Sequence, residues 1–215
     1  MKTITLFWEW IQYNEQTLRN LRNEKPKVQK MFLFWLDKHL HYYCEGLECI
    51  IMFPANESEP IQLVISACGN PEFFEQVITL IDASPKLKNW QFTAFIQPTQ
   101  SIDEMEAGLD KPYVFKDITL KASELKFMPF QYENEKKIDM IVYLKNFTVL
   151  CHNKNLLHVV YIIMQDILGE KSLYENVNFV ELVQLPEVVS NELICLYDLQ
   201  LYLDEINKDN NSTIK

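Results

Sequence analysis

The predicted fold is decided by residues 61–98, IQLVISACGNPEFFEQVITLIDASPKLKNWQFTAFIQP. Apolar side chains alternate with their neighbours over 61–67, which is the spacing of a β-strand with one face turned to a core. Asn70 and Pro71 then change the pattern, because Asn caps helix N-termini with its side-chain oxygen and Pro fits the first helical position. The stretch therefore begins as a strand that leads into a capped helix.

The rest of the stretch predicts that helix and a second strand. Residues 72–83 carry apolar side chains at helical spacing, and Ser84-Pro85 ends the helix because a residue before proline avoids the α region. Residues 90–96 alternate again as a strand. With a preceding strand over 47–53, the order is ββαβ. Six residues are expected in the core: Phe74, Ile78, Trp90, Phe92, Val160 and Ile163.

The second half repeats this order. Residues 138–144 alternate as a strand, and 154–168 form a helix that is apolar on most sides and hence buried on most sides. A strand over 177–183 follows, and 127–131 would pair with the first. The repeat is either an internal duplication or a chance recurrence of a common order.

We therefore expect an α+β fold (α/β in the broad sense). It has two ββαβ units, a mixed, mainly antiparallel sheet and an N-terminal helical hairpin, formed by helices over 3–22 and 27–44. The expected organisation is one globular domain, 1–206, built of two sub-units. The sub-units are expected at about 1–98 and 113–206, with an acidic connector at 99–112 and a disordered tail at 207–215.

Composition limits the function. The formal charge is −10 and the pI about 4.9, which disfavours nucleic acid and anionic membranes as partners, since both require a basic surface. Such a charge suits solubility, or a basic protein partner. The start, MKTITLFWEWIQYNEQ, does not resemble a signal peptide, and an odd number of cysteines, five, fits reduced thiols. We expect a cytoplasmic protein.

The best candidates for metal binding are His39, His41, Cys44 and Cys49, since imidazoles and thiolates bind zinc. Two positions apart on a helix, however, His39 and His41 point in different directions, and Cys49 takes a core-facing strand position. We expect no metal.

Catalytic chemistry has equally little support. Cys151-His152, with His158 nearby, lacks the flanking sequence of a known cysteine nucleophile. The chain has no G-x-S-x-G, no phosphate-binding glycine loop and no H-E-x-x-H. We expect no cofactor and no catalytic residue.

The candidate partner-binding residues are the carboxylates Asp103, Glu104, Glu106 and Asp110. They cluster in a segment with almost no large apolar residues. A segment that buries little is free to bind, and clustered carboxylates would speed association with a basic protein. The simpler interpretation is a solvated loop.

The sequence of residues 63–98 resembles that of a family of uncharacterised bacterial proteins, which is common in Bacteroidetes-type genomes. The pattern of that family is ISA-G---F--V--LV-AAP-L--W---AF. Residues 166–186, DILGEKSLYENVNFVELVQLP, are similar to the same family's D-LLGE segment and following strand. This domain of unknown function provides no catalytic residues to transfer. Because acidic single-domain families of this kind occur beside secreted toxins, the resemblance implies an immunity-type protein.

We therefore expect a non-enzymatic cytosolic protein-binding module, of the kind that inhibits a basic bacterial toxin. The alternatives are a hydrolase or nucleotide-handling enzyme with a site in the cleft between the two halves, and a structural or regulatory subunit. Oligomeric state and strand order do not follow from the sequence.

Overall fold

The structure is a computed structural model that describes residues 2–56, 58–132, 135–188 and 190–212. Contacts divide the chain into two compact units, residues 1–96 and 97–215. Helices and mixed sheets are both present, so the predicted α+β class is confirmed. Among the described residues, no helix has the length and apolar character needed to cross a bilayer.

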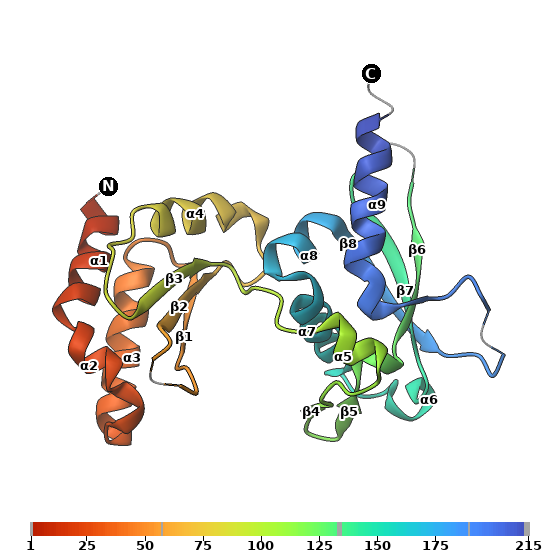
Figure 1. The fold of residues 1–215 in the computed structure, drawn as a ribbon, viewed down its shortest axis with the longest axis horizontal. Coiled ribbons are helices and arrows are strands. Elements are labelled where there is room, and N and C mark those ends of the chain that lie inside the picture. The colour runs from red at the N-terminus through yellow and green to blue at the C-terminus, as the bar shows by residue number, and fades with distance from the viewer. Residues whose placement is uncertain (1, 57, 133–134, 189, 213–215) are drawn as a thin grey trace. The chain divides into compact units, whose positions relative to one another are not determined.

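The first unit contains a three-stranded sheet in the order β1-β2-β3 (Figure 1). Strands β1 and β2 pair antiparallel, whereas β2 and β3 pair parallel, with helix α4 between them in the chain. Asn70 accepts a hydrogen bond from the Glu72 amide, as its predicted capping role requires, although it caps a 3-10 turn that precedes α4. The bounds are β1 Glu48–Met52, β2 Ile61–Ser66, the 3-10 turn Pro71–Phe73, α4 Phe74–Asp82 and β3 Trp90–Ala94.

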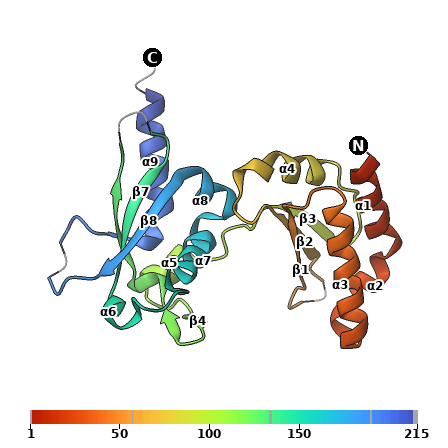
Figure 2. The same cartoon turned by 180° about the vertical axis from the view of Figure 1, so that it is seen from behind.

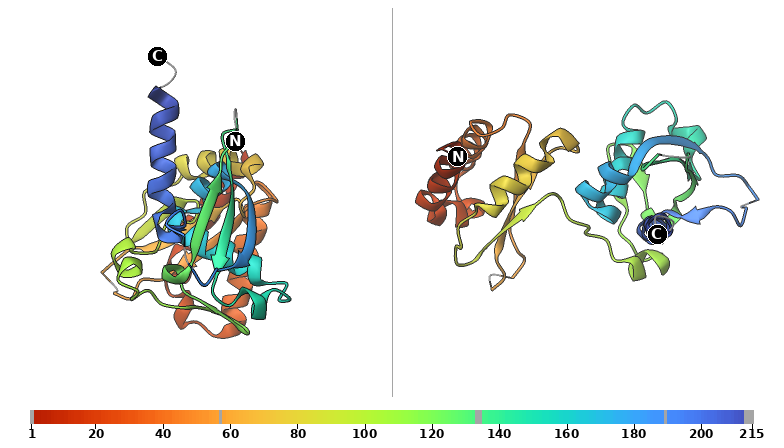
Figure 3. Two further views of the ribbon diagram at one scale, coloured as in Figure 1. Left: turned by 90° about the vertical axis from the view of Figure 1, so that its right-hand side faces the viewer. Right: turned by 90° about the horizontal axis from the view of Figure 1, so that it is seen from above.

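An N-terminal helical hairpin completes this unit. Helix α3 runs back beside α1, and Figure 3 shows the two helices together in the red and orange part of the chain. The chain turns between them through α2 and a 3-10 turn. The bounds are α1 Lys2–Tyr13, α2 Glu15–Arg19, the 3-10 turn Leu21–Asn23 and α3 Pro26–His41.

Trp8 connects the hairpin to the rest of the first unit. It is 3% exposed, and its indole N–H donates to the Leu80 carbonyl at 2.9 Å. Its ring also packs edge-on against Phe92, with centroids 4.7 Å apart. The Leu80 carbonyl lies in the last turn of α4, where carbonyls lack partners within the helix. Trp8 therefore holds α1 against both α4 and β3.

The second unit contains a four-stranded sheet in the order β8-β7-β6-β9 and a separate β4-β5 hairpin. The antiparallel β6-β7 pair is followed by a parallel β7-β8 pair (Figure 2), which is the pairing order of β1, β2 and β3. Whether the two halves superpose as a duplication stays a prediction. The bounds are β4 Tyr113–Phe115, β5 Ile118–Leu120, β6 Lys126–Phe130, β7 Ile138–Leu144, β8 Val177–Gln184 and β9 Ile194–Cys195.

Helix α7 forms the centre of the second unit's core, as its apolar pattern predicts. Seven of its thirteen residues are buried, and it ends at Gly169, whose φ of 77° favours glycine. The helices and 3-10 turns of this unit are α5 Ile102–Glu106, the turn Ala122–Glu124, α6 Phe147–Leu150, α7 Leu156–Leu168, α8 Glu170–Asn176, the turn Leu196–Asp198 and α9 Leu199–Ser212.

The expected acidic connector, 99–112, belongs to the second unit. The Thr99 amide donates to the Asp166 carbonyl at 2.9 Å, and the Tyr113 hydroxyl donates to the Asp166 carboxylate at 2.8 Å. Met105 enters the core cluster at 1% exposure. The segment is thus attached through hydrogen bonds and one buried apolar side chain, which composition alone underestimates.

Two further expectations need correction. The expected tail is helical over 207–212, because α9 continues to Ser212, while 213–215 lie outside the described residues. Ile78 is only half-buried, and so is Phe92. In α4 the core side of the helix follows Phe74, Val77 and Leu80 at i, i+3 and i+6, so Ile78 lies at its edge.

Candidate functional site

A cluster of ring side chains covers the outer side of the α1–α3 hairpin, and we call it the aromatic face. Helix α1 contributes one ring and α3, with the residue after it, contributes the rest. The members are Trp10, Phe32, Phe34, Trp35, His39 and Tyr42.

The rings of the aromatic face are in mutual contact. Trp10 stacks on His39, with centroids 5.1 Å apart and planes 24° apart. His39 in turn meets Tyr42 edge-on at 5.8 Å, and Trp35 meets Phe34 edge-on at 5.4 Å. Burial lowers the pKa of His39 below its usual value, which favours a neutral imidazole in this stack. The face is therefore an ordered surface and not a set of independent side chains.

The aromatic face arises because α3 carries more apolar residues than its buried side can use. Leu36 and Leu40 are the residues of α3 that face the core. Phe34 and Trp35 remain 53% and 45% exposed. Single exposed apolar residues are ordinary, but a contiguous group on one helix typically marks an interaction site.

The surroundings of this face are basic, although the protein is acidic. Helix α3 contains three Lys against one Asp, a net charge of +2 within a chain of net charge −10. Lys27, Lys30 and Lys38 are exposed, and within the described part of the chain none of them has an ion-pair partner. The helix thus offers uncompensated positive charge beside exposed rings.

The predicted partner-binding acids are divided by the structure. Asp103, Glu104 and Glu106 are exposed on the short helix α5. Burial, and after it the negative charge of nearby Glu106, raises the pKa of the Asp198 carboxyl group. Three of the four predicted acids are therefore accessible to a partner.

Asp110 is the fourth, and it is not accessible. It is 2% exposed, and its Oδ2 accepts a hydrogen bond from the Ser123 amide at 3.2 Å. Its Oδ1 has no hydrogen-bond partner among the described residues. Because the Asp110 carboxylate is covered by its own unit, it is not available on the surface as the other three acids are. Partner binding by Asp110 stays a prediction.

The histidine and cysteine candidates have separate surroundings. His39 belongs to the aromatic stack, whereas His41 lies 3.2 Å from the Leu47 carbonyl and 3.4 Å from Asp37. Burial raises the pKa of the Cys49 thiol to about 12, with smaller contributions from nearby acids. Across the described ranges, no three His, Cys, Asp or Glu side chains form a metal-binding group. The expectation that no metal binds stays a prediction.

The cysteine–histidine candidates of the second unit also have separate surroundings. The exposed Cys151 thiol donates to the Thr148 carbonyl at 3.5 Å. His158 meets Phe115 edge-on, with centroids 6.3 Å apart. These contacts do not form a thiol–imidazole pair.

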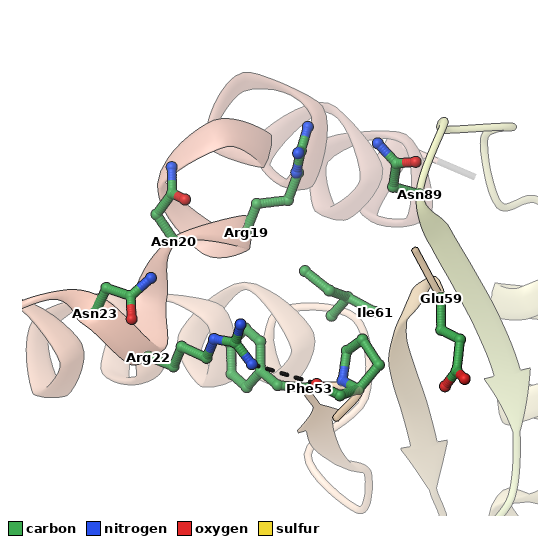
Figure 4. Close-up of a pocket in the computed structure, with 9 residues that line it drawn as sticks. Arg19, Asn20, Arg22, Asn23, Phe53, Glu59, Ile61 and Asn89 are labelled. Carbon is green, nitrogen blue, oxygen red and sulfur yellow. Dashed lines mark hydrogen bonds between the residues drawn. The ribbon is translucent and has the colours of Figure 1, made fainter. Parts of the chain in front are cut away.

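A polar pocket of about 220 Å³ lies beside the segment that connects α1 to α3 (Figure 4). Arg22 donates to the Pro54 carbonyl at 3.2 Å, and Arg19 lies 3.9 Å from the Glu15 carboxylate. Because both guanidinium groups already contact protein oxygens, we assign the pocket no ligand. Its lining residues are Arg19, Asn20, Arg22, Asn23, Phe53, Pro54, Glu59, Ile61 and Asn89.

Comparison with known proteins adds no assignment. No protein-family model matches the chain, and neither the curated proteins nor the solved structures include a significant match to it. The resemblance to the uncharacterised bacterial family therefore stays a prediction. The aromatic face was missed from sequence, although the excess of apolar residues over 31–42 was a signal that could have indicated it.

Proposed function

We propose that the protein is a protein-binding module and that the aromatic face is its docking surface. The observation that carries this proposal is the contiguous, mutually packed group of rings on the α1–α3 hairpin. Phe34, Trp35 and Tyr42 are the exposed members of this group, and the other three rings are half-buried. Trp and Tyr are enriched among the residues that dominate binding energy at protein interfaces. Rings that already restrain one another lose less side-chain entropy on binding than isolated side chains do.

The rigid support behind the face favours the same function. Trp8, on the buried side of α1, is fixed by its hydrogen bond to Leu80. Trp10 follows two residues later and stacks on His39 within the aromatic face. A surface presented by well-packed helices needs little reorganisation when a partner arrives.

Variant capture tests this proposal. The wild-type chain, a Phe34→Ser/Trp35→Ser variant and a Phe179→Ser control are immobilised and exposed to native lysate, and retained proteins are compared by mass spectrometry. Phe179 is a suitable control because its 56% exposure matches the 53% of Phe34, while it lies on β8 in the second unit. Loss of a central interface residue typically costs about 2 kcal/mol or more, roughly thirtyfold in affinity.

The expected result is a protein retained by the wild type and by Phe179→Ser but lost from the double variant. Far-UV circular dichroism of all three must match, so that unfolding is not mistaken for lost binding. If the double variant retains the same proteins as the wild type, the aromatic face is not the docking surface.

A second candidate, an immunity-type inhibitor of a basic toxin, is supported by the exposure of Asp103, Glu104 and Glu106 on α5. Replacing the three acids by Asn, Gln and Gln should then slow association with a basic partner and flatten its salt dependence. The Phe34→Ser/Trp35→Ser variant serves as the reciprocal control. An unchanged association rate in the neutralised variant would contradict this candidate.

A further inference from the structure

We infer that the aromatic face binds an acidic amphipathic helix of a partner protein. This inference rests on the proposed function, because it names the chemistry of the segment that the same surface would receive. Three observations lead to it. Two concern α3, namely the arrangement of its exposed apolar side chains and the charge beside them. The third is the net charge of the whole chain.

Two exposed apolar side chains and one half-buried imidazole form a ridge along α3. Met31, Trp35 and His39 are spaced four residues apart, so that they follow one another along one side of the helix. Met31 and Trp35 are both exposed, and His39 is held by the Trp10 ring. Helix α3 has sixteen residues, which corresponds to about 24 Å at 1.5 Å per residue. Four turns of a second helix fit against a ridge of that length.

The charge beside the ridge selects an acidic segment. Lys27 and Lys38 lie about 40° and about 20° from Met31 around the helix axis, given 100° per residue. Both side chains are exposed. The one acid within α3, Asp37, lies 3.4 Å from His41 on the same helix. Asp and Glu on the flank of an incoming helix would therefore meet lysines without an existing ion pair.

A membrane surface fits these observations less well. Basic helices with exposed aromatic residues also bind anionic bilayers. The first unit as a whole, however, carries nine Lys and Arg against eleven Asp and Glu, a net charge of −2, and the second unit carries −8. A planar anionic surface would be repelled by this charge, whereas a single helix contacts only the basic ridge.

Two synthetic peptides test the inference. Both are peptides of about 18 residues, long enough for four helical turns or more, with Leu at i, i+3, i+4 and i+7 spacing. One carries Glu and the other carries Lys at the remaining positions. Binding of each fluorescently labelled peptide to the full chain is followed by anisotropy at low and moderate NaCl. Vesicles of phosphatidylcholine with phosphatidylserine form a third arm, and light scattering reports self-association.

The expected result is binding of the Glu peptide, weakened by NaCl, with little binding of the Lys peptide. Trp35→Ser should weaken binding of the Glu peptide at least about tenfold, as loss of a hot-spot residue does. Lys27→Glu/Lys38→Glu should reverse the preference between the peptides. Lys86→Glu/Lys88→Glu is the matched control, since both lysines are exposed in the first unit outside α3, and it should leave the preference unchanged.

Several results would overturn the inference: equal binding of both peptides, binding of neither, binding of vesicles alone, or self-association that occupies the face. They also separate it from the proposed function. If the lysate partner depends on Phe34 and Trp35 while the Glu peptide does not bind, the docking surface stands and the acidic helix is wrong. If capture is also independent of these residues, both proposals fail.

Discussion

Exchanging Trp8 or Trp35 for Phe tests which sides of the α1–α3 hairpin are buried and exposed. The two indoles lie on neighbouring helices of one unit, yet Trp8 is 3% exposed and Trp35 is 45% exposed. Trp→Phe keeps a ring at each position and removes the indole N–H. The two substitutions are therefore chemically matched and differ only in their surroundings.

The expected losses in the free energy of unfolding differ several-fold between the two positions. At position 8 the substitution removes the 2.9 Å hydrogen bond to the Leu80 carbonyl. A buried polar group left without its partner costs about 1–3 kcal/mol. At position 35 the side chain is half in solvent, and substitutions at such surface positions usually stay within about 0.5 kcal/mol. Trp8→Phe should therefore destabilise the first unit, and Trp35→Phe should change it little.

Tryptophan emission during urea unfolding measures this difference. All four tryptophans, at positions 8, 10, 35 and 90, lie in the first unit, so their emission reports on that unit. With an m-value of about 2 kcal/mol per M urea, the loss at Trp8 corresponds to a midpoint lowered by about 0.5–1.5 M. Each variant keeps three tryptophans as reporters.

Two results would refute the reasoning. A Trp8→Phe midpoint equal to that of the wild type would mean that the indole does not satisfy the Leu80 carbonyl. A larger loss at Trp35 than at Trp8 would mean that the hairpin presents its opposite side to the sheet. In that second case the aromatic face would belong to the hydrophobic core, and the observation on which the proposed function rests would be wrong.

Two further predictions concern groups outside the aromatic face. Tyr113→Phe removes the donor to the Asp166 carboxylate and should lower the stability of the second unit by about 1–3 kcal/mol; an unchanged midpoint by far-UV circular dichroism would contradict this bond. Cys49, with a pKa raised to about 12, should resist iodoacetamide at pH 8 while the exposed Cys68 and Cys151 react. Because the unfolded thiol ionises near pH 9, the contribution of Cys49 to stability is complete below that pH and falls between about pH 9 and 12; labelling of Cys49 as fast as Cys68 would show that it is not shielded.

Regular local patterns in the sequence were enough for the main elements. The alternation over 61–67 and the Asn70-Pro71 cap gave a strand and a helix start that agree with the structure. The helix expected over 154–168 was recognised as buried on most sides, because nearly every face of it is apolar. These features depend on residues within one or two turns of each other, so periodicity alone is sufficient.

Composition predicted less well the structure of segments whose position depends on residues far away in the sequence. Residues 99–112 carry few large apolar side chains, yet Met105 enters the core and Asp110 is covered. The Asp166 backbone and side chain hold the ends of that segment, at a distance of more than fifty residues in sequence. No local pattern encodes a partner that far away.

The sequence by itself determined the α+β class, the main strands and helices, and the overall charge of −10. The tertiary structure alone decided which apolar residues of α3 stay outside. A helix of this composition has more apolar residues than one buried side can hold, and periodicity does not say which side the sheet covers. That choice was made by the packing of Trp8, Leu36 and Leu40 against the rest of the first unit, which leaves Phe34 and Trp35 in solvent.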